Sequence, residues 1–159
     1  MSKYKSLLAI ILIFLAGCYE KKVDDLMWLS DDRDSAFIQI ERHLRGFDLA
    51  MKEVGERYYN IFSAVNDDNW GYAIYNLTKL KTAIVNGLER RPNRKLSAQS
   101  FLNYSIPALM KTLKSKEREN FLNEFELFKQ SCNNCHISEK VEYVNVILPQ
   151  LHSSMVGRQ

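Results

Sequence analysis

Apolar side chains recur every three or four residues along most of this chain, and this spacing limits its fold more than any other feature. It places apolar side chains on one face of an α-helix. No stretch sustains the alternation of apolar and polar residues that a half-buried β-strand shows. The chain also holds only six glycines and three prolines in 159 residues, which disfavours a loop-rich β-sandwich. The sequence therefore predicts an all-α fold.

Four amphipathic segments carry the pattern. The first is expected to be one long helix from Phe37 to Phe62. The second begins at Trp70 and must end near Arg91, because a proline disfavours helical geometry in the residue before it. The third covers residues 97–113 with a kink around Pro107, and the fourth begins beyond Ser115. Short connections between such segments favour an antiparallel four-helix bundle over residues 36–138, and the lack of an internal repeat disfavours an α-solenoid.

The first seventeen residues have the order of a secretory signal. Lys3 and Lys5 precede an unbroken apolar run over residues 7–15, which is shorter than the roughly 20 residues of a transmembrane helix. The sequence Leu15-Ala16-Gly17-Cys18 resembles the lipobox of bacterial lipoproteins. This resemblance implies cleavage before Cys18, lipid attachment to that cysteine, and a place in the cell envelope facing the periplasm. An ordinary signal peptide and a membrane-spanning anchor are the alternatives.

Removal of residues 1–17 changes the charge of the chain. Two of the 22 basic side chains leave and all 19 acidic side chains remain, so the formal net charge falls from +3 to +1. No basic stripe with interleaved aromatic residues remains, and no nucleic-acid partner is expected. Residues 18–35 are expected to be a tether from the lipid anchor. Tyr19 rather than aspartate follows the cysteine, which by analogy with lipoprotein sorting slightly favours the outer membrane.

The fourth segment carries the chemistry of the chain in Cys132, Cys135 and His136. Side chains three and four positions apart share one face of a helix. Two thiols at this spacing suit addition to the two vinyl groups of one haem, and the adjacent imidazole then binds the iron as its proximal ligand. The sequence therefore predicts one covalently bound haem c. The odd number of cysteines is then explained, with one for lipid and two for haem.

A cysteine pair at this spacing has three other uses in proteins. A thioredoxin-like pair needs a βαβ setting, and a structural zinc site needs four ligands, whereas no second cysteine pair exists. A plain Cys132–Cys135 disulfide in a non-haem lipoprotein scaffold stays open as an alternative. The export signal favours haem, because bacteria attach c-type haem outside the cytoplasmic membrane.

A single Cys-x-x-Cys-His motif late in a helical chain resembles the class II c-type cytochromes, the cytochrome c-prime group of four-helix bundles. Class I cytochromes usually carry the motif near the start of their domain. The resemblance covers residues 36–138 in architecture and only Cys132, Cys135 and His136 as a motif. It implies a bundle around one haem and a candidate homodimer. The departure is the tail, residues 139–159, which we expect to pack on or near the haem end.

In class II proteins the sixth iron ligand decides the function. A methionine on the first helix gives low-spin electron carriers, whereas a bulky apolar residue leaves an open iron that binds small gases. Counting residues along antiparallel helices places Met51 about one turn from the level of His136. Met51 is therefore the leading distal ligand. His152 or Met155 in the tail and an open iron are the alternatives, and His43 is expected to be a surface residue.

Three arginines, Arg90, Arg91 and Arg94, gather after the second segment. In an antiparallel bundle this point lies at the same end as His136, so these arginines are candidate partners of the haem propionates. They are alternatively solvated cations that complement a helix dipole, or a docking patch for an acidic redox partner.

Together these observations predict one-electron transfer by a lipid-anchored monohaem cytochrome. Its expected partners are periplasmic or membrane redox proteins and, through Cys18, the lipid bilayer. The alternatives are a five-coordinate gas-binding or sensing module and the disulfide scaffold. Enzymatic turnover, such as peroxidase-like activity, is the least supported hypothesis, because the spacing identifies no acid–base residues on the distal side of the haem.

Overall fold

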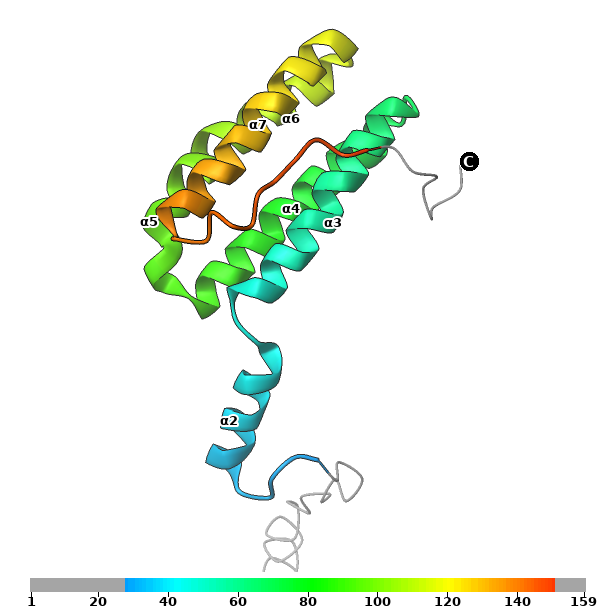
Figure 1. Ribbon diagram of the computed structural model, residues 1–159. Coiled ribbons are helices and arrows are strands. Elements are labelled where there is room, and N and C mark those ends of the chain that lie inside the picture. The colour runs from blue at the N-terminus through cyan, green and yellow to red at the C-terminus, as the bar shows by residue number, and fades with distance from the viewer. Residues whose placement is uncertain (1–27, 151–159) are drawn as a thin grey trace, which may run out of the picture. The chain divides into compact units, whose positions relative to one another are not determined.

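The structure is a computed structural model in which residues 28–150 are described (Figure 1). Every regular element within that range is helical, so the prediction of an all-α fold is confirmed. The chain forms two compact units, Met1–His43 and Leu44–Gln159. None of the helices within residues 28–150 is both long and apolar enough to cross a membrane.

The first unit contains most of helix α2, Arg33–Leu44. The helix begins after Asp32, whose carboxylate accepts a hydrogen bond from the Ser35 amide at 2.8 Å. No residue of α2 is buried, and Phe37 is 59% exposed. The Trp28 ring meets the His43 ring edge to face, with centroids 5.1 Å apart.

The expectation of one long helix from Phe37 to Phe62 is wrong. Helix α2 ends at Leu44, and α3 begins at Phe47 and runs to Asn66. Arg45 has a left-handed φ of 59°, and the extended Gly46 is the N-cap of α3. The Asp48 carboxylate accepts from the Gly46 amide at 3.1 Å and pairs with the Arg45 guanidinium. These contacts stabilise a helix start inside an apolar spacing that continues without interruption.

Helices α3 and α4, Trp70–Arg90, lie side by side (Figure 1). Helix α4 begins at Trp70, as predicted, and the Asn69 side chain caps it by accepting from the Tyr72 amide at 3.1 Å. Gly87 allows the two helices to approach closely. A Cβ atom on Gly87 would lie 2.7 Å from that of Ala50 and 2.9 Å from the Phe47 ring.

The third segment is helical but irregular. It comprises a 3₁₀ turn η1, Pro92–Arg94, then α5, Lys95–Ser100, a π-helical turn η2, Phe101–Ser105, and α6, Ile106–Ser115. The predicted irregularity therefore lies in the turn before Pro107. A proline has no amide hydrogen and its ring crowds the carbonyl one turn earlier, so the helix widens there.

Helix α7, Arg118–Ser138, follows a left-handed residue, Lys116. Three phenylalanines of α7 are almost completely buried, and Tyr58 of α3 stacks on one of them, Phe125, with ring centroids 4.6 Å apart. The backbones that run closest are those of α3 with α4, α6 with α7 and α4 with α6. Aromatic side chains fill the space between α3 and α7. They are Tyr58, Phe62, Phe121, Phe125 and Phe128.

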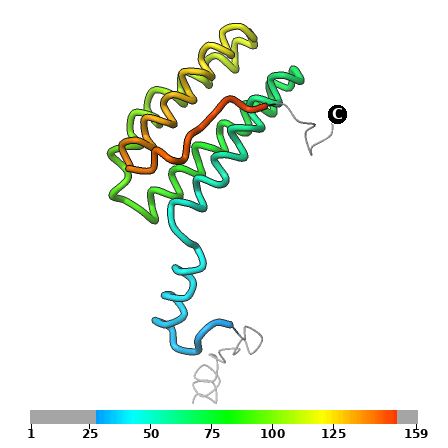
Figure 2. Tube along the Cα trace, viewed as in Figure 1, coloured from blue at the N-terminus to red at the C-terminus, as the bar shows by residue number. Residues whose placement is uncertain are grey.

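Residues 139–150 follow α7 without forming a further helix. Figures 1 and 2 show this tail, coloured red, running back between α7 and α3. The Tyr58 hydroxyl donates to the carbonyl of Ile147 at 3.2 Å, and Val146 packs against the core. The described part of the tail is therefore bound to α3 through Tyr58 and to α7 through Asn133, whose side chain accepts from the Val146 amide.

Candidate functional site

The Cys-x-x-Cys-His motif lies in the last two turns of α7, where Cys132, Cys135 and His136 are all half-buried. The helix is continuous through the motif and ends at Ser138, so the predicted spacing of three and four positions on a helix holds here. Both cysteines carry free thiols.

The two thiols have different neighbours. Cys132 packs against the core beside Tyr58, and burial raises its pKa to about 12, with a further contribution from Cys135. Burial also raises the pKa of Cys135, while the nearby Ser97 hydroxyl opposes the shift. Both thiols are therefore neutral near pH 7. A thiol–disulfide exchange site needs a thiolate, so these surroundings do not resemble a thioredoxin-like site.

The His136 imidazole is held by the tail. Its Nδ1 atom lies 2.5 Å from the carbonyl oxygen of Val144. A carbonyl oxygen only accepts hydrogen bonds, so Nδ1 must carry the proton in this contact. In the neutral ring, Nε2 then has its lone pair available for a metal.

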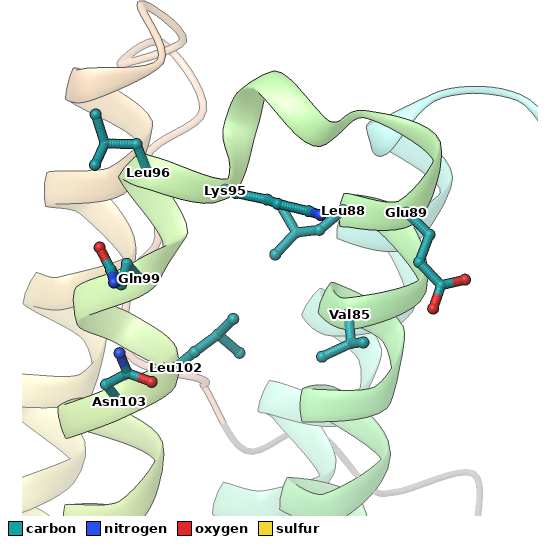
Figure 3. Close-up of a pocket in the computed structure, with 8 residues that line it drawn as sticks. All are labelled: Val85, Leu88, Glu89, Lys95, Leu96, Gln99, Leu102 and Asn103. Carbon is teal, nitrogen blue, oxygen red and sulfur yellow. The ribbon is translucent and has the colours of Figure 1, made fainter.

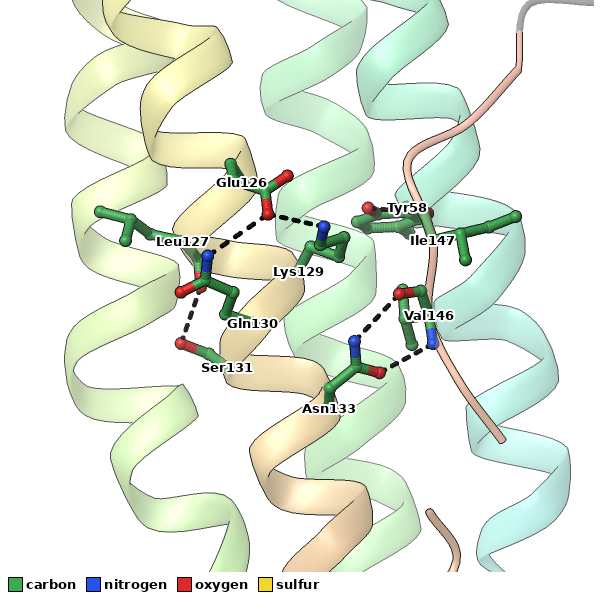
Figure 4. A network of polar contacts seen from close by, with 9 residues as sticks. All are labelled: Tyr58, Glu126, Leu127, Lys129, Gln130, Ser131, Asn133, Val146 and Ile147. Carbon is green, nitrogen blue, oxygen red and sulfur yellow. Dashed lines mark hydrogen bonds and ion pairs between the residues drawn. The ribbon is translucent and has the colours of Figure 1, made fainter. Parts of the chain in front are cut away.

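The tail is attached to the motif by Asn133, which lies between the two cysteines. The Asn133 amide nitrogen donates to the Val146 carbonyl at 3.0 Å, and its oxygen accepts from the Val146 amide at 2.7 Å (Figure 4). Figure 4 also shows Glu126 bound to Lys129 and Gln130, one to two turns before the motif.

Of the three predicted arginines, Arg94 lies in the surroundings of the motif. It forms an ion pair with Glu139, just beyond α7, and the same carboxylate accepts from the Ser97 hydroxyl. The Arg94 guanidinium also lies over the Phe47 ring, 5.5 Å from its centroid. Arg94 therefore joins the start of α3 to the end of α7, close to Cys135.

Arg90 and Arg91 have other surroundings. The Arg90 side chain is half-buried, and its Nε atom is buried without a hydrogen-bond partner. Arg91 is exposed and donates to the carbonyl of Arg90 at 2.7 Å. Neither observation links Arg90 or Arg91 to the motif, so the binding of haem propionates by these two residues stays a prediction.

The residues considered for the distal side of the haem lie in different parts of the chain. Met51 lies on α3, where it is half-buried and packs against the core. His43 is exposed in the first unit, as expected of a surface residue. His152 and Met155 lie outside the described residues, and so does the predicted lipid-attachment site Cys18.

Sequence reasoning missed the residues that surround the motif. Asn133 was visible as part of the motif, and its side-chain amide was the only available signal of a partner. The Val144 carbonyl is a backbone group and leaves no signal in the sequence. Glu139 and Ser97 are ordinary polar residues that the fold brings to Arg94.

Two thiols and one imidazole on one helix are the protein groups that a covalently bound haem requires. Within residues 28–150, no three side chains of His, Cys, Asp or Glu gather in a way that holds a metal. A haem iron takes four ligands from its own porphyrin, so one histidine and two covalent thiols suffice on the protein side.

A separate groove of about 690 Å³ lies between α4 and the α5–η2 segment (Figure 3). Val85 of α4 and Leu102 of η2 face each other across it, and Glu89 and Lys95 lie at its rim. No motif residue lines this groove.

The chain matches no protein-family model, no curated protein and no solved structure.

Proposed function

We propose that this chain is a lipid-anchored monohaem c-type cytochrome that transfers one electron at a time. Its helices would form an antiparallel four-helix bundle, with the haem bound near the end of α7. One observation carries the proposal: the Val144 carbonyl holds His136 by Nδ1, which leaves Nε2 for iron one helical turn from Cys132.

Haem supplies an iron that cycles between two oxidation states, and the residues of this chain would bind and shield it. Cys132 and Cys135 would form the two thioether bonds, and His136 would supply the proximal nitrogen. Tyr58 and Phe128 lie on the core side of Cys132, where they limit access of water. Low water access and the bonds around the proximal ligand are the means by which a protein sets the potential of such an iron.

Arg94 is the arginine best placed to bind a propionate. Its guanidinium already neutralises the Glu139 carboxylate beside Cys135. Five N–H donors allow one guanidinium to serve two acid groups. Arg94 would therefore share its donors between Glu139 and a propionate, while Arg90 and Arg91 stay further candidates.

Met51 is proposed as the distal ligand, because it is the methionine of α3 that packs against the core toward the start of that helix. With Met51 and His136 both bound, the iron would be low-spin, which would favour electron transfer. An open iron would instead favour the gas-binding function.

The proposed location depends on the first residues of the chain, and the proposed partners depend on electron transfer. The lipobox-like sequence ending at Cys18 would anchor the protein to the envelope, facing the periplasm. Its partners would be periplasmic or membrane redox proteins, and a homodimer is the candidate assembly.

A redox titration of the full chain, expressed with c-type haem-maturation machinery, tests electron transfer. The account predicts a single reversible transition of the haem spectrum with potential, and its Nernst slope should correspond to one electron. The spectrum should be low-spin in both oxidation states. A high-spin ferrous form that binds carbon monoxide readily would contradict it and favour gas binding. The variant carrying Cys132→Ser and Cys135→Ser is the control and should show no such redox transition.

A further inference from the structure

Asn133 lies between the two motif cysteines and binds the tail. We propose that Asn133 is a positioning residue that orients the His136 imidazole by fixing the backbone of residues 144–146. This inference rests on the proposed function, in which His136 binds haem iron. It concerns groups of this chain that exist before any haem is attached.

The contact between Asn133 and the tail is reciprocal. Its side-chain amide donates to the Val146 carbonyl at 3.0 Å and accepts from the Val146 amide at 2.7 Å. Both groups are half-buried, and the Val146 side chain packs against the core. The pair copies the exchange of two hydrogen bonds between neighbouring β-strands, so it fixes both the position and the direction of the tail backbone.

Fixing Val146 also fixes the carbonyl that His136 uses. Val144 is two residues earlier in the same segment, and its oxygen lies 2.5 Å from Nδ1 of His136. Between His136 and Val144 the chain makes a tight turn, with hydrogen bonds of 2.9 Å from Val141 to His136 and from Val144 to Val141. The tail is therefore tied to the motif on both sides of the Val144 carbonyl.

This arrangement sets the tautomer of the ring. A neutral imidazole places its proton on either nitrogen, and the partner of one nitrogen decides which one is free. With the Val144 carbonyl in place, the proton stays on Nδ1 and Nε2 presents its lone pair. Without it, the ring rotates freely and both tautomers are populated, so the proximal ligand is no longer prepared for iron.

The test uses the full chain in detergent, expressed without haem-maturation machinery, so that only the protein's own groups are observed. Nitrogen NMR of the imidazoles reports the His136 tautomer at a pH above the ordinary histidine pKa of about 6.5. Hydrogen exchange reports the Val146 amide. In Asn133→Ala we expect at least tenfold faster exchange at Val146 and a mixture of His136 tautomers.

Asn134→Ala is the matched control, because Asn134 is the exposed neighbour of Asn133 in the same helix. It should leave both signals as in the parent chain. Asn133→Asp keeps an acceptor for the Val146 amide but places a carboxylate against the Val146 carbonyl, so intermediate exchange is expected. This milder variant also serves if Asn133→Ala fails to fold.

Two results would overturn the inference. One is a Val146 amide that stays protected in Asn133→Ala. The other is an exposed Val146 amide with His136 still wholly in the Nδ1–H form, since the tail would then not orient the ring. Covalent haem attachment is measured separately on chains matured with the machinery. A chain that never binds haem but shows the predicted tautomer change would contradict only the proposed function.

Discussion

The Tyr58 ring stacks on Phe125 with centroids 4.6 Å apart, and its hydroxyl donates to the carbonyl of Ile147 at 3.2 Å. One residue of α3 thus joins the core on α7 to the tail. Burial raises the pKa of Tyr58 well above its usual value of about 10, and the nearby Cys132 and Glu126 contribute to this rise.

This pKa predicts how stability responds to alkali. The folded chain keeps the Tyr58 proton at a pH where the unfolded chain loses it, so the free energy of unfolding falls as pH rises above about 10. Below that pH, Tyr58 adds no pH dependence. Urea unfolding of the chain without haem between pH 8 and pH 11 measures the effect. Tyr58→Phe should remove part of the alkaline slope, and an unchanged slope would contradict the assignment to Tyr58.

Gly87 and Gly55 give a matched pair of helix substitutions. Gly87→Ala would place a methyl group 2.7 Å from Ala50, so the α3–α4 pair must separate and we expect a loss of about 1–3 kcal/mol. Gly55 is exposed on α3 with no neighbouring side chain within 4 Å of such a methyl group. Gly55→Ala should therefore stabilise the chain by about 0.5–1 kcal/mol. Denaturant unfolding of both variants measures the changes in the free energy of unfolding. Equal changes would contradict the close packing of α3 against α4 at Gly87.

Met51 is predicted to bind the iron opposite His136. Met51→Leu keeps an apolar side chain of similar volume, so the fold should lose less than about 1.5 kcal/mol. The haem-bound variant should instead become high-spin and bind carbon monoxide in its ferrous form. Met110→Leu is the control and should leave the iron low-spin, since Met110 is also half-buried against the core but lies on α6. If Met51→Leu stays low-spin, Met51 is not the ligand.

Arg94 is predicted to affect the reduction potential, and Arg91 is its control. Removal of a positive charge near the haem stabilises the oxidised iron, so Arg94→Ala should lower the potential. A contribution of about 1.4 kcal/mol corresponds to 59 mV for a one-electron couple, so a shift of tens of millivolts is expected. The exposed Arg91 lacks a contact with Glu139 or Ser97, and Arg91→Ala should shift the potential less. Equal shifts would contradict a specific role for Arg94.

Much of the fold was predictable because its signals are local. The helix start at Trp70 and the helix end before Pro92 each depend on a residue and its immediate neighbours. The break at Arg45 was not predicted, because apolar residues keep their helical spacing on both sides of it. Gly46 followed by Asp48 was the local signal there, and the regular spacing outweighed it.

The site was predictable only in part, for a related reason. Spacing alone places Cys132, Cys135 and His136 on one helix. The expectation of antiparallel helices put Arg94 near the end of the fourth segment, and in the structure Arg94 pairs with Glu139 just beyond α7. The contacts of Asn133 and His136 depend on where an irregular tail folds back. Backbone carbonyls carry no residue identity, so the bond from His136 to Val144 could be seen only in the structure.

The intact mass of the full chain, after expression with c-type haem-maturation machinery and denaturation, tests the central claim most directly. Thioether bonds survive denaturation, so the account predicts that the mass exceeds that of the protein and its lipid by one haem. The increase should be absent when Cys132→Ser and Cys135→Ser are combined. A parent chain that carries no haem, with its two motif cysteines free or joined in a disulfide, would contradict the account.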